Sequence, residues 1–212
     1  MNLYNFVGLT IIALMFIAGA SVYPNMPELM ATHWDANGNV DGYSSRTVGI
    51  FLIPVMTFGI YLLFLLIPKI AVYKKNIQSF YKTYSNFMVG IISFMAIIYA
   101  VTLLSNLGYV INMNYIIMPA LGFLFYGVSF LLEKSKKNFF IGIRTPWTLS
   151  SDKVWEKTHK LGATIFRILA VLAFASLLFP NGIILFIIPT FASIIFLVVY
   201  SYFEYQKEKN YE

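Results

Sequence analysis

The chain has 212 residues, of which 59% are apolar and 11% are charged, and it carries a formal net charge of +6. A composition this apolar excludes an ordinary soluble domain and is typical of an integral membrane protein. The chain has no cysteine, which excludes disulfides, thiol nucleophiles and thiolate metal ligands. The basic residues lie between apolar runs, so membrane topology explains them and we expect no direct contact with nucleic acid.

Six apolar runs of about 18 to 21 residues are each long enough to cross a hydrocarbon core of roughly 30 Å as a helix. They occupy residues 3–23, 48–67, 86–106, 115–132, 161–179 and 183–203. We therefore predict an all-α integral membrane protein with six transmembrane helices, forming a single polytopic membrane domain over residues 1–212. Its main connections are an outer loop at 24–47 and cytoplasmic loops at 68–85 and 133–160.

The first run contains Ala18, Gly19 and Ala20, small residues that resemble the cleavage site of a signal peptide. However, no basic residue precedes the run, and the run is longer than the usual signal-peptide core. We therefore predict that this helix is retained as the first membrane span.

The distribution of Lys and Arg predicts the orientation of the chain. Thirteen of the 15 basic residues follow the second, fourth or sixth span, whereas Arg46 lies in the outer loop and Arg167 within the fifth span. Loops that face the cytoplasm carry an excess of Lys and Arg, so the N and C termini are both predicted to be cytoplasmic.

The outer loop contains the dipeptide Asn37-Gly38, a strong signal for a tight turn because both residues tolerate a positive φ. Residues 32–34 and 40–43 are therefore expected to pair as a short hairpin. An alternative is a calcium loop, since oxygen-bearing side chains alternate along it at Asp35, Asn37, Asn39 and Asp41. Val40 and Arg46 stand where that loop needs Gly and Glu, so the sequence favours a plain turn and no metal.

The inner stretch 138–160 concentrates charged and aromatic residues between two apolar runs. Pro146 favours an extended conformation for the residue before it, so a helix is expected to restart only afterwards. Ser150 or Ser151 can cap that helix, and Asp152 then lies in the first turn, where the helix dipole favours an anion. The helix is predicted to continue directly into the fifth span.

One polar stripe along this helix recurs near the 3.6-residue period, at Asp152, Glu156, Lys160 and Arg167. Glu156 and Lys160 have a favourable i, i+4 spacing. Arg167 lies roughly 9 Å from the cytoplasmic end, where a charge is costly unless it is paired. Either Arg167 faces the bundle interior and anchors a polar cluster or a ligand, or its side chain extends back to the membrane surface.

The remaining candidates for chemistry are few. His33 is either a proton sensor or ligand in an outward-facing site, or a hydrogen-bonding loop residue, and His159 is predicted on the opposite side of the membrane. Trp147 and Trp155 are either interfacial anchors or binding residues. The chain has no HExxH motif, Gly-rich phosphate loop or nucleophile elbow, so we predict neither an enzyme nor a cofactor.

The segment GIRTPWTLSSDKVWEKTHKLG, residues 142–162, resembles the signature of the SdpI family of multi-pass membrane proteins, named for an immunity protein against a bacterial toxin. The outer segment MPELMATHWDANGNVDGYSSR is similar to a module at the front of many such proteins. With six spans, the resemblance covers essentially the whole chain. The candidate binding residues in the inner signature are Gly142, Arg144, Thr145, Pro146, Trp147, Thr148, Val154, Trp155 and His159. Those in the outer module are His33, Trp34, Asp35, Asp41 and Gly42.

The resemblance implies a non-enzymatic immunity and signal-transduction protein in the cytoplasmic membrane of a prokaryote. It would confer resistance to a secreted antimicrobial peptide toxin outside and hold a cytosolic autorepressor at the membrane inside. Such a relay requires a ligand that binds one of two conformers better than the other.

The alternative function is a small membrane transporter or channel, with Arg167 facing a path. Pro54, Pro119 and Pro189 occupy similar positions in the even-numbered spans. They indicate either three related helical hairpins or prolines that a membrane helix simply tolerates.

Overall fold

The computed structural model confirms six long helices and describes residues 2–210. Met1, Tyr211 and Glu212, which the predicted 1–212 domain includes, lie outside the described residues. Each long helix is long and apolar enough to cross a membrane. The six are α1 (Leu3–Val22), α2 (Arg46–Ile70), α4 (Tyr81–Asn106), α5 (Asn114–Lys134), α7 (Asp152–Ala175) and α8 (Ile184–Lys209).

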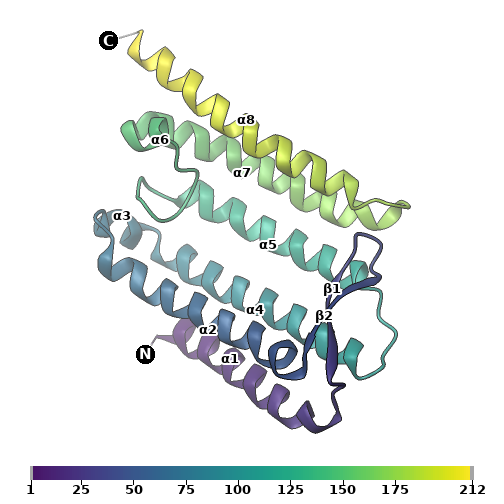
Figure 1. Ribbon diagram of the computed structural model, residues 1–212. Coiled ribbons are helices and arrows are strands. Elements are labelled where there is room, and N and C mark those ends of the chain that lie inside the picture. The colour runs from purple at the N-terminus through teal and green to yellow at the C-terminus, as the bar shows by residue number, and fades with distance from the viewer. Residues whose placement is uncertain (1, 211–212) are drawn as a thin grey trace.

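The long helices are connected by shorter elements. These are η1 (Tyr23–Asn25), β1 (Leu29–Trp34), β2 (Val40–Ser45), α3 (Lys74–Ser79), α6 (Pro146–Ser150) and η2 (Ser176–Leu178). All six long helices run side by side, with both described ends of the chain at one end of the bundle and the hairpin β1/β2 at the other (Figure 1). We call these the termini end and the hairpin end.

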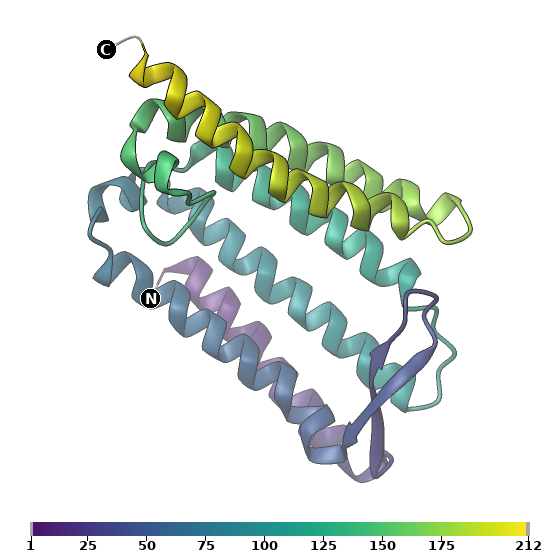
Figure 2. The same cartoon turned by 45° about the horizontal axis from the view of Figure 1, so that its top comes forward.

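The bundle consists of two groups of three helices. Helices α1, α2 and α4 pack on one another, α7 packs on both α5 and α8, and α4 contacts α5 where the groups meet. Figure 2 shows the two groups as successive layers, with the loop between α5 and α6 curling back at the termini end. The most extensive contact, between α5 and α7, crosses the boundary between two of the expected hairpins. Pro54, Pro119 and Pro189 all lie inside continuous helices.

Several helices extend further at the termini end than the apolar runs predicted. Helices α2, α5 and α8 carry Lys69, Lys134, Lys207 and Lys209 in their last turns. Cations stabilise a helix C-terminus, and long Lys side chains can reach water from the membrane surface. A prediction that ends each helix at its first charged residue therefore makes these helices too short.

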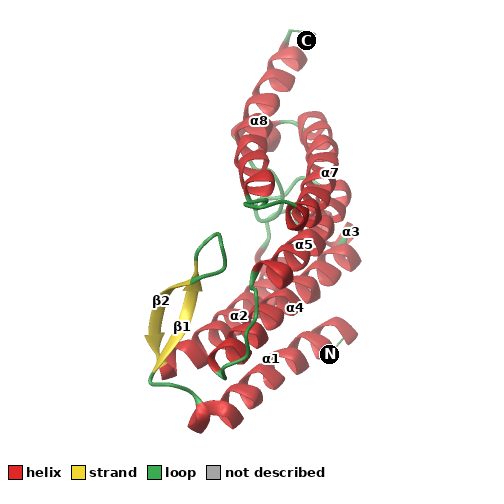
Figure 3. Ribbon diagram, turned by 90° about the vertical axis from the view of Figure 1, so that its right-hand side faces the viewer, coloured by secondary structure: helices red, strands yellow, loops and turns green. Residues whose placement is uncertain are grey.

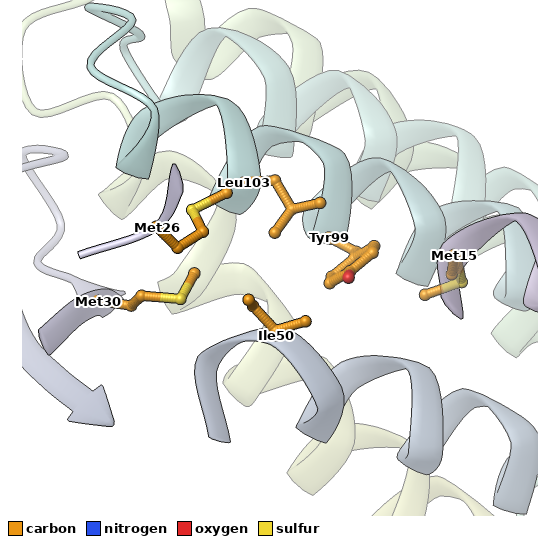
Figure 4. Close-up of a cluster of buried hydrophobic side chains, with 6 residues drawn as sticks. All are labelled: Met15, Met26, Met30, Ile50, Tyr99 and Leu103. Atoms are coloured by element: carbon orange, nitrogen blue, oxygen red, sulfur yellow. The ribbon is translucent and has the colours of Figure 1, made fainter. Parts of the chain in front are cut away.

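The hairpin end confirms the predicted strand pair. Strands β1 and β2 are antiparallel, and they lie against the ends of α2 and α4 (Figure 3). Asn106, the last residue of α4, donates from Nδ2 to the Ala31 carbonyl (2.9 Å) and accepts the Ala31 N–H (2.8 Å). Met30 is fully buried beneath the hairpin. Figure 4 shows the cluster around it, which comprises Met15, Met26, Met30, Ile50, Tyr99 and Leu103.

Candidate functional site in the loop before α7

The loop between α5 and α7, residues 135–151, lies at the termini end and contains most of the predicted inner site. Its first half is organised around Asn138, whose side chain is fully buried. Oδ1 of Asn138 accepts the N–H groups of Phe140 (2.8 Å) and Ile141 (2.7 Å). Nδ2 donates to the carbonyls of Lys136 (2.8 Å) and Ile141 (3.0 Å). One side chain therefore satisfies four backbone groups that have no helix or strand partner.

The second half of the loop is fixed by a contact between Gly142 and α7. Gly142 has a φ of +115°, and a Cβ at this position would stand 2.3 Å from Nε2 of His159. Nε2 accepts the N–H of Ile143 (2.9 Å), and Nδ1 is 2.8 Å from the Trp155 carbonyl, to which it donates. Because Nε2 accepts a hydrogen bond, the buried His159 ring is neutral with its proton on Nδ1.

Trp155 completes this contact. Its ring stacks on His159 with centroids 3.9 Å apart, and its Nε1 donates to the Ser135 carbonyl (3.1 Å). Only 2% of Trp155 is exposed, which disfavours the interfacial anchor among its two predicted roles. Its Nε1 hydrogen bond is made within the protein, so Trp155 supports the fold of the loop.

Two threonines shape the turn into α6. Thr145 is extended, as expected for the residue before a proline. Its side chain accepts the Thr148 N–H (3.2 Å), while Thr148 Oγ1 accepts the Thr145 N–H (2.9 Å), which makes a capping box. Thr145 Oγ1 also lies 2.9 Å from Ser201 Oγ on α8. The helix thus restarts at Pro146, earlier than expected, because proline suits the first helical position.

The predicted capping of the helix by Ser150 or Ser151 is confirmed, and Ser151 is the residue that caps it. Ser151 caps α7, because its side chain accepts the Val154 N–H (3.2 Å), whereas Ser150 closes α6. Ser151 Oγ also donates to Glu208 of α8 (2.5 Å). The loop is therefore attached to both α7 and α8.

Ion pairs extend this attachment along α7 and α8. Glu204 is buried and contacts Lys157 (2.5 Å) and Lys207 (2.9 Å). Lys137 of the loop pairs with Asp152 at the start of α7 (2.8 Å). These contacts hold the termini ends of α7 and α8 in one arrangement.

A smaller part of the predicted signature faces outward. Arg144 and Pro146 are exposed and Trp147 is half-buried. The Arg144 Nη1 donates to the Phe139 carbonyl (2.5 Å), and the Trp147 ring meets Tyr202 of α8 edge-on with centroids 5.2 Å apart. We call Arg144, Pro146 and Trp147 the outward triplet, because these residues leave a surface free for a partner.

A polar cleft of about 540 Å³ lies between α5, α7 and this loop. The predicted stripe lines it, from Asp152 through Glu156 and Lys160 to Arg167. Arg167 pairs with Glu133, and its guanidinium lies 5.7 Å from the centroid of the Phe130 ring. The structure therefore favours an anchored polar cluster for Arg167, which lines the cleft and whose side chain is 40% exposed.

The partner of Arg167 was missed because the fourth span was expected to end at residue 132. Helix α5 continues to Lys134 and thereby brings Glu133 to the same level as Arg167. The expected Glu156–Lys160 pair does not occur among the ion pairs of residues 2–210, and both side chains are exposed. The cleft therefore has an ion pair at each end, Lys137–Asp152 and Arg167–Glu133.

Only some of the residues predicted for the outer site lie together in the structure. His33 of β1 contacts Asp41 of β2 through Nδ1 and Oδ1, and Gly42 lies opposite His33 so closely that a Cβ would stand 2.9 Å from that of His33. Trp34 pairs with Val40 in the register of the strands. Asp41 bulges out where the register shifts, so the hairpin presents a His–Asp pair on its exposed surface.

Asp35 serves the turn between the strands. Its Oδ1 accepts the N–H groups of Asn37 (2.8 Å) and Asn39 (2.9 Å), and Oδ2 accepts from Asn39 Nδ2 (3.3 Å). The carboxylate that a calcium loop would need is thus occupied by the turn itself. Within residues 2–210, no three His, Asp or Glu side chains cluster as metal ligands would.

This turn predicts a specific response to acid. The Asn39 N–H, with the Asn39 amide and the Asn37 N–H, holds the pKa of the Asp35 carboxyl below its ordinary value of 3.8. The ionised carboxylate therefore stabilises the turn fully at pH values above this ordinary pKa, and the stabilisation is lost as the pH falls through the lower folded-state pKa. We expect the Asn39 amide resonance of the protein in micelles to stay unchanged from pH 7 to about pH 5 and to shift only below pH 4.

The matched control is Asp35→Asn, which keeps an acceptor oxygen but cannot titrate. Its Asn39 resonance is expected to stay constant below pH 4, since His33 and Asp41 lie on the strands rather than in the turn. A wild-type shift centred between pH 5 and pH 7 would contradict this account of the turn.

The fold and these two sites define a multi-pass membrane protein with an ordered extramembrane hairpin at one end and a rigid polar loop at the other. Residues 134–202 match the model of the SdpI/YfhL protein family, and residues 10–58 match a domain of unknown function, DUF1648. The first range contains the loop, α7 and most of α8, and the second contains the hairpin.

A curated relative agrees with both matches. The protein named immunity protein SdpI, from Bacillus subtilis (strain 168), is 29% identical to the chain over 209 residues, which is 96% of each chain. No solved structure matches the chain. The match of residues 134–202 to the SdpI/YfhL model and the similarity to immunity protein SdpI agree with the resemblance of the inner and outer segments.

Proposed function

We propose that this protein confers immunity to a secreted antimicrobial peptide toxin on the cell that carries it in its cytoplasmic membrane. The observation that carries the proposal is the similarity to immunity protein SdpI, which spans nearly the full length of both chains. It includes the hairpin and the rigid loop, the two ordered extramembrane parts.

The proposed orientation places the termini end in the cytoplasm and the hairpin outside. Lys69, Lys134, Lys207 and Lys209 lie in helix turns at the termini end, and the loop before α7 adds further Lys and Arg. Basic residues favour the cytoplasmic side. In this orientation the His33–Asp41 pair faces an incoming toxin.

The proposed inner partner is a cytosolic autorepressor that binds at the outward triplet. An exposed Arg beside a half-buried Trp is a combination enriched in the centres of protein interfaces. The half-buried Gly142 and the buried Thr148, Trp155 and His159 support that surface through their contacts with the loop and with one another. Within this proposal the signature has two parts, a scaffold and a contact surface.

The test is survival of a toxin-sensitive host that expresses the chain during challenge with the secreted toxin peptide. We expect the wild-type chain to restore growth, whereas Arg144→Ala loses repressor capture, measured as recovery of the repressor with the membrane fraction. The matched control is Lys153→Ala, which removes an exposed cation from the start of α7 and leaves the loop intact. Equal membrane levels of the three proteins must be verified by immunoblot.

The two parts of the proposal fail separately in this experiment. No protection by a well-expressed wild-type chain would refute the immunity function. Protection by the wild-type chain with unchanged repressor capture by Arg144→Ala would refute the outward triplet as the inner contact and leave immunity standing.

The polar cleft supports a second candidate, a small transporter, because it reaches Arg167 from the termini end. Beyond Arg167 the helices close through stacked Phe125 and Phe166 and through the buried Leu169 and Ala173. A transporter would have to open this packing. Substrate flux in proteoliposomes that Arg167→Leu abolishes would favour this candidate over immunity.

The same cleft does not make His159 a general base. Its Nδ1 donates to the Trp155 carbonyl and its Nε2 accepts from Ile143, so both ring nitrogens are used by the backbone. A general base needs a free nitrogen within reach of the proton that it removes. We therefore retain a non-enzymatic role for the protein.

A further inference from the structure

A groove of about 630 Å³ runs along the outer surface of the bundle where α4 meets α5. Its walls are mainly apolar, with Phe87, Phe94 and Ile97 on α4 and Phe123 and Leu124 on α5. Ile97 and Phe123 are exposed, so the groove opens toward the surrounding lipid. It is the surface at which the two groups of three helices join.

Apart from Ser93 at mid-length, the polar residues of the groove lie near its termini end. Thr83 and Asn86 lie in the first two turns of α4, and Lys134 is the last residue of α5. None of these three side chains takes part in the hydrogen bonds or ion pairs between residues 2–210. The mouth therefore offers one cation and two neutral hydrogen-bonding groups at the level of the membrane surface.

The dimensions of the groove limit what can occupy it. Thr83 and Ile97 are 14 residues apart on α4, so the groove is roughly 21 Å long at 1.5 Å per residue. Dividing its volume by this length gives a mean cross-section of roughly 30 Å². A whole helix, whose diameter with side chains is about 10 to 12 Å, does not fit inside a groove of this cross-section.

A flexible hydrocarbon chain meets this limit. One leaflet of the hydrocarbon core is about 15 Å thick, so a groove of this length accommodates an acyl chain that begins at the membrane surface. At mid-length Gly90 has nothing within 4 Å of the place where a Cβ would stand, and Gly127 meets only Phe87 at 3.8 Å. Open space next to glycines, rather than a filled helix contact, is what a removable chain requires.

We propose that this groove is a binding site for an anionic phospholipid, with an acyl chain between α4 and α5 and its headgroup phosphate at Lys134, Thr83 and Asn86. The cation at the mouth favours an anionic over a zwitterionic headgroup, and a phosphate accepts hydrogen bonds from the hydroxyl and amide. Arg167 does not compete for the phosphate, because its guanidinium is paired with Glu133. A lipid held here would brace the contact between the two groups of helices.

The test is native mass spectrometry of the full-length protein in non-ionic detergent, titrated with phosphatidylglycerol or phosphatidylcholine of identical acyl chains. We expect one tightly retained phosphatidylglycerol per chain. Gly90→Leu should reduce its retention at least tenfold, because the new side chain fills the groove. The matched control is Gly59→Leu, at another exposed helical glycine with nothing within 4 Å, which should retain phosphatidylglycerol as the wild type does.

The headgroup part of the proposal has its own pair of variants. Lys134→Gln should weaken phosphatidylglycerol binding by roughly fivefold, the effect of about 1 kcal/mol for one basic residue at an anionic surface, and leave phosphatidylcholine unchanged. Lys69→Gln, at the corresponding last turn of α2, should have no effect.

Three results would overturn the proposal. They are equal retention of both lipids by the wild-type chain, unchanged phosphatidylglycerol retention by Gly90→Leu, and a change of oligomeric state in Gly90→Leu without loss of lipid, which would assign the groove to a second copy.

Discussion

Replacing Asn138 with alanine is expected to lower the free energy of unfolding by about 4 kcal/mol, although the residue lies in a loop. The substitution removes four hydrogen bonds at once and leaves the N–H groups of Phe140 and Ile141 and the carbonyls of Lys136 and Ile141 without partners. An unpaired buried backbone group costs about 1 to 3 kcal/mol, less where water can enter. The loss corresponds to a fall in the melting temperature of roughly 8 to 16 °C.

Thermal unfolding of the purified protein in detergent, followed by tryptophan fluorescence, measures this effect. The reporter is well placed, because Trp155 donates to the Ser135 carbonyl at the start of the same loop. The control is Asn112→Ala, which removes a single exposed hydrogen bond to the Asn114 N–H. A loss for Asn138→Ala no larger than that for Asn112→Ala would show that the loop does not depend on its asparagine.

Length and hydropathy were sufficient to predict the six membrane helices, since a bilayer permits few other structures for long apolar runs. The hairpin followed from Asn37-Gly38, because few dipeptides accept the backbone of so tight a turn. A cap at Ser150 or Ser151 was predictable for the same local reason, and the structure has it at Ser151. Each of these features is determined by residues that are close together in the chain.

The inner site was less predictable because its contacts join residues that are distant in sequence. Asn138 is the exception, because it bonds to backbone groups two and three residues away, a local pattern that asparagine commonly forms. The Thr145–Ser201 contact requires the relative position of α6 and α8. The sequence did offer a compositional signal. An asparagine between several lysines and the apolar Phe139 indicates a structural role rather than a solvent-exposed one.

The charged residues of the membrane helices show the same limit of sequence-based prediction. Arg167 was recognised as a charge that needs a partner, but Glu133 lies 34 residues away and was assigned to a loop. Only the true end of α5 places the two at one level. Helix ends are the least certain part of a sequence-based assignment, so a pair that depends on them is found only in the structure.

This division between scaffold and surface has a functional consequence. Most of the inner signature is buried and hydrogen-bonded, so changes at Gly142, Thr148, Trp155 or His159 should reduce the amount of folded protein before they affect any partner. Variants of the outward triplet should instead affect a partner before they reduce the amount of folded protein. Loss of protection is therefore interpretable only together with the melting temperature of the same variant.

Gly142→Ala is expected to be the clearest scaffold variant, with a loss of roughly 3 kcal/mol or more. A residue with a side chain is strained at a φ of +115°, at a cost of about 1 to 3 kcal/mol. The new Cβ would also stand 2.3 Å from His159 Nε2 and 3.2 Å from Trp155, so the ring must move away and release the Ile143 N–H. That unpaired group adds about 1 to 3 kcal/mol.

Two controls separate these causes in the same thermal unfolding experiment. Gly59→Ala, at an exposed helical glycine with open space around it, should be neutral or stabilising by up to about 1 kcal/mol. In a His159→Ala background, Gly142→Ala should cost at least about 1 kcal/mol less than in the wild type, because the clash and the hydrogen bond are already gone. If the two losses simply add, backbone strain alone explains the glycine. A smaller combined loss shows instead that Gly142 is required because it lets the loop approach His159, which ties the start of the signature to its end across 17 residues of chain.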